Sequence, residues 1–240
     1  MMIGKRSVLA VIVARGGSKG LPRKNILDVA GRPMIAWSIA AAQASRYLDR
    51  TILSTDDEAI IATAQAWNCE VPFIRPAELA TEEASIIDVL IHAMDALEQA
   101  YEYVVLLQAT SPLRLGQDID DCLEACERAG APACLTISPT KPPEWMVHVG
   151  EDGRMQRVVE PEGAANRRQL LDATYAFNGA VYVARTEWFR RERTFFTSET
   201  QAHIMPSDRS VDVDTQADYL LAKALMGLRH TTVINQGSRP

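Results

Sequence analysis

Residues 8–25 read VLAVIVARGGSKGLPRKN. The six consecutive apolar residues at 8–13 predict a strand buried on both faces, as strands of parallel sheets are. Ligands of open α/β folds bind beyond the carboxyl ends of such strands, so the segment that follows lies where a ligand is expected. The stretch therefore predicts an α/β fold with a binding loop directly after its first strand.

The loop at residues 14–25 combines glycines with positive charge. Its glycines, which allow tight or left-handed backbone close to an anion, are Gly16, Gly17 and Gly20. Its cations are Arg15, Lys19, Arg23 and Lys24. A solvated basic surface loop is the alternative, but its place after a buried strand favours phosphate binding. The spacing matches neither the Walker pattern nor the dinucleotide fingerprint.

The composition sets limits on the class of protein. The chain has 240 residues, 47% of them hydrophobic and 23% charged, which fits one soluble globular domain, with or without an appendage. A net charge of −6 argues against general nucleic-acid binding. No apolar run is long enough to span a bilayer, and residues 8–14 fit a first strand better than a signal-peptide core. We therefore expect a cytoplasmic protein that binds neither nucleic acid nor membrane.

The cysteines predict neither a zinc site nor a disulfide framework. They are Cys69, Cys122, Cys126 and Cys134. Only Cys122 and Cys126 are one helical turn apart, and no histidine lies near them in the sequence to complete a zinc set. Reduced thiols in the core are the favoured interpretation.

Strand-like and helical patterns alternate through the first half of the chain. This alternation predicts a doubly wound, mostly parallel sheet. Strands are expected at 8–13, 50–54, near 71, 103–108, 133–137, 180–184 and 210–213. Helices are expected near 33–44, 57–67, 85–99, from a cap at Asp118 onward, near 187–193, and at 216–228.

After Ser138 the pattern changes. Three prolines lie between residues 139 and 143, and two short apolar runs flank Glu151-Asp152-Gly153-Arg154, which is typical of a hairpin turn. We expect an inserted arm at 139–173, an α/β core at 1–138 and 174–230, and a flexible tail at 231–240.

Two carboxylates near the end of the chain predict a metal site. Asp212 and Asp214 are one residue apart, so on an extended strand both face the same side and can share a hard cation such as Mg²⁺. The pattern alone is weak, since two surface carboxylates at a strand end would look the same.

Six blocks of the sequence resemble one family in its order. They are the glycine loop, Ser54-Thr55-Asp56-Asp57, Arg75-Pro76-Ala77-Glu78-Leu79-Ala80, Leu107-Gln108-Ala109-Thr110-Ser111-Pro112-Leu113-Arg114, Asn178-Gly179-Ala180-Val181-Tyr182 and Ser210-Val211-Asp212-Val213-Asp214-Thr215. Together they cover roughly residues 7 to 226 and resemble the N-acylneuraminate cytidylyltransferases, or CMP-sialic acid synthetases, which include CMP-legionaminate and CMP-pseudaminate synthetases. The resemblance implies a nucleotide-diphospho-sugar transferase-like fold and a homodimer in which the arm reaches the partner's active site.

The implied reaction joins CTP to a nonulosonic acid. The anomeric hydroxyl attacks the α-phosphate with Mg²⁺ or Mn²⁺, giving CMP-sugar and pyrophosphate. By resemblance the catalytic residues are Arg15, Lys19, Lys24, Asp212 and Asp214, the last two being the metal ligands. The nucleotide-binding residues are Arg15, Gly16, Gly17, Ser18, Lys19, Lys24, Asn25, Arg75 and Ser85. The sugar-binding residues are Gln108, Thr110, Arg168, Asn178 and Tyr182, with Arg167 as the alternative to Arg168.

Several assignments have alternatives. Arg75 could instead anchor its loop by an ion pair with Glu78, Ser85 could be a helix cap, and Tyr182 could belong to the core. Ala109 and the segment 141–145 depart from the family pattern, so the particular nonulosonic acid stays open. A CMP-KDO-type or other sugar nucleotidyltransferase is a second reading, and a non-catalytic nucleotide-binding module is a third.

Overall fold

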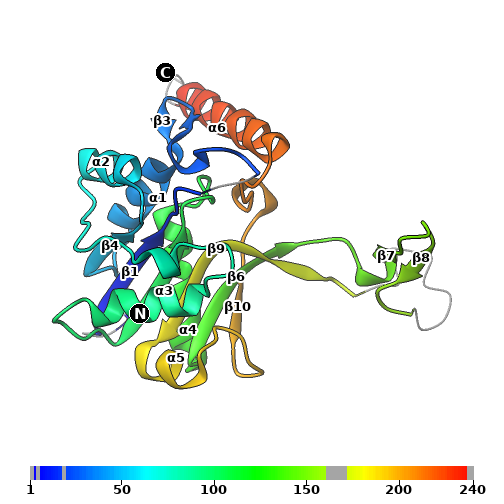
Figure 1. Cartoon of the computed structure of the whole chain (residues 1–240). Coiled ribbons are helices and arrows are strands. Elements are labelled where there is room, and N and C mark those ends of the chain that lie inside the picture. Colours follow the sequence, from blue (N-terminus) through cyan, green and yellow to red (C-terminus); the bar gives the residue numbers. More distant parts are fainter. Residues whose placement is uncertain (1–2, 4–5, 18–19, 161–171, 237–240) are drawn as a thin grey trace.

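The fold is built on one six-stranded sheet. The computed structural model describes residues 3, 6–17, 20–160 and 172–236. In spatial order the strands are β10 (Gln201–Ile204), β6 (Ala133–Pro139), β9 (Tyr175–Arg185), β5 (Tyr103–Gln108), β1 (Val8–Val13) and β4 (Arg50–Ser54). Only β9 runs antiparallel to its neighbours β5 and β6. The predicted mostly parallel sheet is therefore confirmed (Figure 1).

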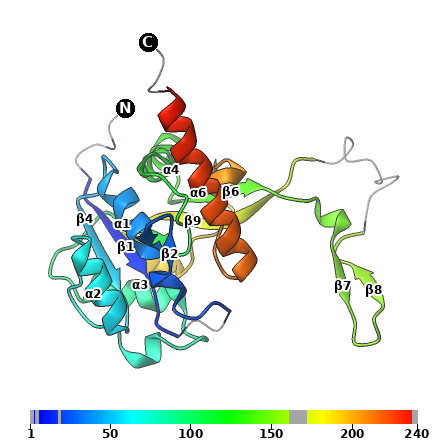
Figure 2. The ribbon, with the colours of Figure 1, turned by 90° about the horizontal axis from the view of Figure 1, so that it is seen from above.

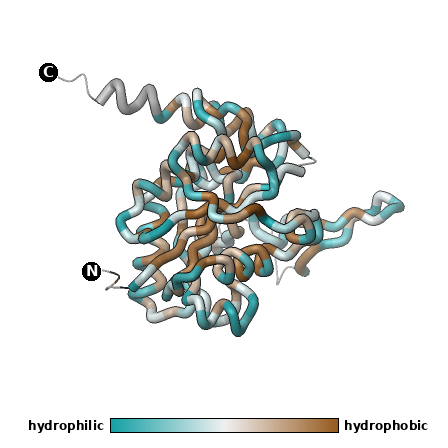
Figure 3. The backbone as a smooth tube through the Cα atoms, turned by 60° about the vertical axis from the view of Figure 1, so that its left-hand side comes forward, coloured by the Kyte–Doolittle hydropathy of each residue, from teal (hydrophilic) through white to brown (hydrophobic). Residues whose placement is uncertain are grey.

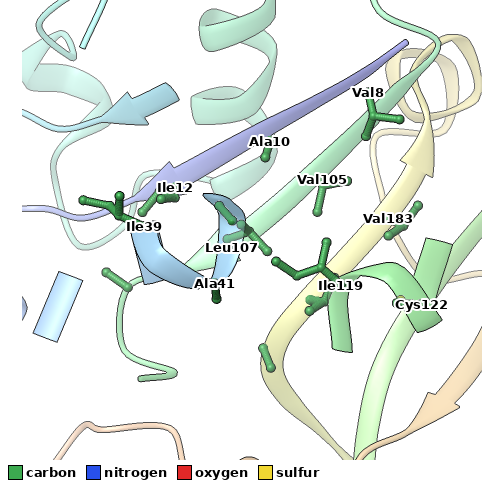
Figure 4. Close-up of a cluster of buried hydrophobic side chains, with 14 of the residues drawn as sticks. Val8, Ala10, Ile12, Ile39, Ala41, Val105, Leu107, Ile119, Cys122 and Val183 are labelled. Carbon is green, nitrogen blue, oxygen red and sulfur yellow. The ribbon is translucent and has the colours of Figure 1, made fainter. Parts of the chain in front are cut away.

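Helices cover both faces of this sheet. They are α1 (Met34–Gln43), α2 (Glu58–Ala66), α3 (Ile86–Asp95), α4 (Gly116–Ala129) and α5 (Thr186–Glu192), whereas α6 (Gln216–Gln236) packs beside the loop after β1. One core cluster joins α1, α2 and α4 to one face, and Figure 4 shows part of it. A second cluster joins α3 and α5 to the other face. Within the described residues, no helix is both long and apolar enough to cross a membrane.

Strand β1 is apolar throughout because both of its faces are buried. Val8, Ala10 and Ile12 pack into the first cluster, while Leu9 and Val11 pack into the second. Side chains alternate between the faces of a strand, so a strand covered on both sides has no position for a polar residue. Full burial of each large side chain stabilises the fold by about 1.5–3 kcal/mol. The chain then leaves the sheet at the carboxyl ends of β1, β4 and β5.

The short elements lie mostly around this edge and in the arm. A small hairpin consists of β2 (Asp28–Val29) and β3 (Arg32–Pro33), and a second consists of β7 (Val147–Val149) and β8 (Met155–Arg157). Single 3-10 turns are η1 (Lys24–Ile26), η2 (Ala77–Leu79), η3 (Pro143–Trp145) and η5 (Ser207–Arg209).

A third apolar cluster ties the end of the chain to the glycine loop. Leu21 from the loop, Val213 and the helix residues Ala222 and Met226 pack together. Helix α6 therefore holds the segment containing Asp212 and Asp214 beside the loop, although the two are far apart in the sequence.

The β7–β8 hairpin lies apart from the sheet (Figures 1 and 2). Pairing between β6 and β9 continues outward to Pro139 and Tyr175, which carries the chain away from the body. Every residue of β7 and β8 is exposed, including Val149 and Met155. Figure 3 shows hydrophobic stretches on this projection as well as along the central strands. Such side chains have no cover within the described part of the chain.

Some expected elements differ. Near Val71 there is only a single bridge between Glu70 and Ile52, so the expected strand is absent there. Residues 210–213 belong to no strand, so the strand expected there is absent, and strand β10 at the sheet edge was not expected. Helix α6 continues to Gln236, so residues 231–236 are helical rather than a tail; residues 237–240 lie outside the described part.

The start of α4 is also different. The helix begins at Gly116, and Asp118 lies in its first turn, where its carboxylate accepts a hydrogen bond from the Leu115 backbone N–H at 2.8 Å. The aspartate thus caps from the third helical position, as the acidic member of a capping box does.

The four cysteines are buried free thiols, as expected. Burial raises the pKa of Cys69 and of Cys126 to about 12. They contribute packing rather than reactivity.

Candidate active site

A cavity of about 430 Å³ opens at the carboxyl ends of the neighbouring strands β1 and β5. This is the edge at which doubly wound sheets bind ligands. The predicted site residues that line it are Arg15, Lys24, Asn25, Arg75, Gln108, Thr110 and Asp214. Four separate blocks of the sequence therefore meet in one cavity.

The glycine loop is fixed against two other segments. The Gly16 N–H donates to Asp56 Oδ1 at 3.1 Å, and Asn25 Nδ2 donates to the Arg15 carbonyl at 3.0 Å. A Cβ on Gly20 would lie 2.8 Å from the Asp214 carbonyl oxygen, so only glycine allows this approach. Asn25 Oδ1 is buried and has no hydrogen-bond partner among the described residues, which leaves one acceptor at the cavity.

The two described cations of the predicted catalytic set are paired with carboxylates. Lys24 Nζ lies 2.6 Å from Asp214 Oδ1, and Arg15 Nη2 lies 3.6 Å from Glu82 Oε1. All four side chains line the cavity. The positive charge expected from the sequence is present there, already in contact with internal anions.

Arg75 clamps the ends of two strands. Its Nε donates to Ser54 Oγ at 3.0 Å, and its Nη2 donates to the carbonyl oxygens of Ser54 and Ala14. Burial lowers the pKa of this guanidinium to about 10. These bonds, rather than the ion pair with Glu78 considered from the sequence, hold its side chain in the cavity wall.

The two aspartates have different surroundings. Asp212 is half-buried, and its Oδ1, which is buried, has no hydrogen-bond partner among the described residues. Burial raises the pKa of Asp212 above its usual value, the hydrogen bond with Thr110 opposes this rise, and the Asp214 charge adds to it. The Asp214 side chain is two-thirds exposed. Val213 between them is fully buried, although no sheet includes this segment.

Gly179 keeps space open between two polar groups. It has φ +72°, and a Cβ there would lie 2.8 Å from Gln108 Oε1 and 3.1 Å from Asp212 Oδ2. Both the left-handed backbone and the lack of a side chain are therefore needed at this position.

Asn178 uses its amide within the protein. Its Oδ1 accepts from Thr136 Oγ1 at 2.7 Å and from the Ala180 N–H at 3.1 Å, and its Nδ2 donates to Ser210 Oγ at 3.0 Å. The asparagine was predicted to face the sugar. In the structure it joins β6 and β9 to the segment that carries Asp212.

Tyr182 lies outside the cavity lining but close to its buried carboxylate. Its ring packs against Phe195 with centroids 5.4 Å apart. Burial and, to a lesser extent, the charge of Asp212 raise the pKa of its hydroxyl. This packing agrees with the core reading, and the assignment of Tyr182 to the sugar stays a prediction.

The sequence assigned no role to Arg114, which the structure places behind the site. Its Nη1 donates to the Gln108 carbonyl at 3.2 Å and the Ala180 carbonyl at 2.6 Å. Burial lowers the pKa of this guanidinium to about 10, while the charges of Asp118 and Asp212 oppose the shift. The signal in the sequence was an arginine within the apolar run Pro112-Leu113-Arg114-Leu115, where a charge needs buried partners.

Other predicted residues lie elsewhere. Ser85 caps α3 by accepting from the Ile87 N–H at 3.2 Å, and Gly17 is exposed. Ser18, Lys19, Arg167 and Arg168 lie outside the described residues. Across the ranges that are described, no three His, Cys, Asp or Glu side chains gather as a complete metal site.

Two solved structures share this fold. The CMP:2-keto-3-deoxy-manno-octonic acid synthetase complexed with CTP has a TM-score of 0.70 and 20% identity, over 93% of this chain and 99% of that one. The 4-diphosphocytidyl-2C-methyl-D-erythritol synthase of Anaerococcus prevotii has a TM-score of 0.64 and 15% identity, over 92% and 99%. The fold is therefore that of the nucleotidyltransferases.

Sequence comparison gives the family. The pattern of the family described as Cytidylyltransferase matches residues 9–232, so the chain belongs to that family and is a CTP-dependent nucleotidyltransferase. The CMP-N,N'-diacetyllegionaminic acid synthase of Legionella pneumophila is 31% identical over 95% of this chain and 99% of its own length. The pseudaminic acid cytidylyltransferase of Campylobacter jejuni is 30% identical over 92% and 97%.

A third relative is longer than this chain. The N-acylneuraminate cytidylyltransferase of Streptococcus agalactiae serotype V is 35% identical over 88% of this chain, and the match spans 51% of its own length. The expected resemblance to this group of enzymes is confirmed.

Proposed function

We propose that this enzyme activates a sialic-acid-like nonulosonic acid, converting CTP and the sugar to CMP-sugar and pyrophosphate. The observation that carries this proposal is that relatives named for legionaminic, pseudaminic and neuraminic acids all match nearly the whole chain. The CMP-KDO reading is not favoured, because the synthetase of that sugar resembles this chain in fold at only 20% identity.

The loop side of the cavity suits the nucleotide. Arg15 and Lys24 supply positive charge for the triphosphate, and the unpartnered Asn25 Oδ1 can accept a hydrogen bond from the amino group of cytosine. Arg75, held by the β1 and β4 carbonyls, adds a fixed cation between these groups.

The opposite side suits the acceptor sugar. Gln108 and Thr110 line the cavity there, and the space kept by Gly179 separates Gln108 Oε1 from Asp212 Oδ2. An acceptor held in this space presents its anomeric hydroxyl toward the α-phosphate of CTP. The oxygen–phosphorus bond to the sugar forms as the bond to pyrophosphate breaks, and the hydroxyl proton is released to water. Holding both substrates in one cavity lowers the entropic cost of bringing them together.

Asp212 and Asp214 fit a hard divalent cation. The buried, unpartnered Asp212 Oδ1 is an oxygen that lacks a protein donor, as a ligand atom for Mg²⁺ or Mn²⁺ would. Phosphate oxygens and water would complete the coordination, since no third potential ligand gathers with these two carboxylates among the described residues. A bound ion would offset charge on the α-phosphate and lower the pKa of the attacking hydroxyl.

The assembly we propose is a homodimer formed through the arm. The exposed apolar residues of β7 and β8, among them Val149 and Met155, lie on a projection far from the core (Figure 2). A patch of this kind on a soluble enzyme is typical of an interface. The cytoplasm, where CTP is made, is the proposed location.

Sedimentation equilibrium tests the dimer. The double variant Val149→Asp, Met155→Asp should sediment as a monomer, while Glu151→Gln in the same hairpin turn should stay dimeric. A wild-type protein that is monomeric at high micromolar concentration would contradict the proposal.

Pyrophosphate release tests the reaction. The enzyme is mixed with CTP, Mg²⁺ and one of four acceptors: N-acetylneuraminate, a legionaminate, a pseudaminate or KDO. Turnover with one of the first three supports the proposal and names its substrate. Turnover with KDO alone would favour the second reading, and tight CTP binding with no turnover on any nine-carbon acid would favour a non-catalytic module.

A further inference from the structure

Three phosphate-binding groups of the loop already hold internal carboxylates. Arg15 is paired with Glu82 at 3.6 Å, Lys24 with Asp214 at 2.6 Å, and the Gly16 N–H with Asp56 at 3.1 Å. These carboxylates come from three different parts of the chain, namely the segment before α3, the segment before α6 and the end of β4. Their convergence on one loop is thus a property of the tertiary fold.

The pairs differ in how easily they can open. Asp56 accepts from backbone and belongs to the turn that leads into α2, where Asp57 caps the helix. Glu82 and Arg15 are each about one-third exposed, and Asp214 is two-thirds exposed. Exposed pairs of this kind are weak and can exchange partners with a ligand. Glu82 and Asp214 are therefore the exchangeable members.

We propose that Glu82 is a binding-site residue that competes with the polyphosphate for Arg15 and so weakens phosphate binding. The inference rests on the proposed function, because it takes the ligand of the loop to be the triphosphate of CTP. Glu82 occupies the guanidinium in the free enzyme, gives way when the triphosphate binds, and pairs again with Arg15 as pyrophosphate leaves.

The size of the effect follows from the occupied fraction. When a site is open for only part of the time, the apparent Kd of its ligand equals the intrinsic Kd divided by the open fraction. An exposed ion pair worth about 0.4–0.8 kcal/mol, which is typical of such pairs, leaves Arg15 open for roughly a fifth to a third of the time. Ligands that use Arg15 should thus bind about threefold to fivefold more weakly than to an enzyme without the competing carboxylate.

The same competition acts on substrate and product. CTP and pyrophosphate both need the loop cations, so both are weakened by Glu82, whereas cytidine lacks phosphate and is unaffected. The enzyme gives up some CTP affinity and gains faster pyrophosphate release. Where release of pyrophosphate limits turnover, loss of Glu82 should lower KM for CTP and lower kcat together.

The test compares Glu82→Gln with Glu83→Gln by titration calorimetry. Glu83 is the next residue, is exposed and does not line the cavity, so its variant removes the same charge without the contact. CTP with Mg²⁺, pyrophosphate with Mg²⁺, and cytidine are titrated without an acceptor sugar. Glu82→Gln should bind the first two about threefold to fivefold more tightly and cytidine equally, and the gain should shrink in 1 M salt. Glu83→Gln should match wild type.

A second variant checks the companion pair. Asp214→Asn is titrated with pyrophosphate in the presence of EDTA, so that metal plays no part. This variant should bind pyrophosphate more tightly than wild type, because Lys24 then has no competing carboxylate.

The outcomes separate the two proposals. If wild type binds CTP and turns over but Glu82→Gln matches Glu83→Gln for both phosphate ligands, the competition by Glu82 is wrong and the proposed function stands. If Glu82→Gln raises the affinity for cytidine as much as that for CTP, the substitution does not act through the phosphates and the inference also fails. If wild type binds no CTP, the proposed function itself fails.

Discussion

The two sides of the cavity are built from different kinds of contact. On the loop side, Arg15 and Lys24 make ion pairs with side chains that water can reach. On the inner side, Asn178 and Arg114 make hydrogen bonds that are buried. Exposed charge pairs are weak and replaceable, whereas a buried polar group that loses its partner is costly. The difference separates a side whose ion pairs a ligand could replace from a side whose buried hydrogen bonds keep the site in shape.

The largest expected effect lies where the two sides meet. Asp212→Asn removes a proposed ligand of the divalent cation that would offset charge on the reacting phosphate, so turnover should fall by about a hundredfold or more, equivalent to roughly 2.7 kcal/mol in the barrier. Pyrophosphate release measures it. The free energy of unfolding should not fall, because the variant no longer buries a carboxylate charge; near-normal turnover would contradict the metal assignment.

The next effect tests the inner side alone. Arg114→Met removes the donor for the Gln108 and Ala180 carbonyl oxygens, so the free energy of unfolding should fall by about 2–4 kcal/mol. Urea denaturation measures it. Arg154→Met, at an exposed arginine of the arm, is the matched control and should change the free energy by less than about 0.5 kcal/mol. Equal effects in both variants would show that burial does not distinguish the two arginines.

Gly179→Ala separates strain from lost space. The left-handed backbone alone should cost about 1–2 kcal/mol of unfolding free energy. Gly153→Ala in the arm shares the positive φ but has open space around it, so it reports the strain alone. We expect both variants to be destabilised, and only Gly179→Ala to raise KM for the acceptor sugar, because its Cβ would meet Gln108 Oε1. An unchanged KM would place the acceptor elsewhere.

The smallest effect is in the pH dependence. The pKa of Asp212 is raised above its usual value mainly by burial, so turnover should be lost as pH falls through a range above that of an ordinary aspartate. The sign for stability is opposite: because the protonated form is favoured in the folded state, Asp212 makes the fold lose stability as pH rises through the same range. Profiles of kcat/KM and of unfolding free energy measure the two. An acid limb at ordinary aspartate pKa values would mean that Asp212 is well solvated.

The sequence predicted those elements of the fold whose signal lies within a few neighbouring residues. The buried strand at 8–13, its glycine loop and the amphipathic α4 each have a signal within a few residues. Residues 210–213 misled for the same reason, since alternating Val and Asp resemble a strand. In the structure this segment is tied to the loop after β5 by one backbone hydrogen bond, from the Val213 N–H to the Thr110 carbonyl at 2.8 Å.

The sequence predicted which residue types the candidate site contains, but not which residues pair with one another there. Arg15, Lys24 and Asp214 carry charge patterns that point to phosphate and metal chemistry. The roles of Arg114 and Asn178 depend on partners 66 and 42 residues away, which no spacing rule reveals. The pairing of Arg15 with Glu82 likewise needs the placement of the segment before α3 against the loop.

The cluster of Leu21, Val213 and α6 has a consequence for synthesis of the protein. Lys24 and Asp214, which meet beside this cluster, are 190 residues apart in the chain. At about 5–20 residues per second, the ribosome adds the second roughly 10–40 seconds after the first. The glycine loop is thus made long before Asp214 and helix α6, which complete its surroundings, so the nascent chain completes its candidate active site only near the end of translation.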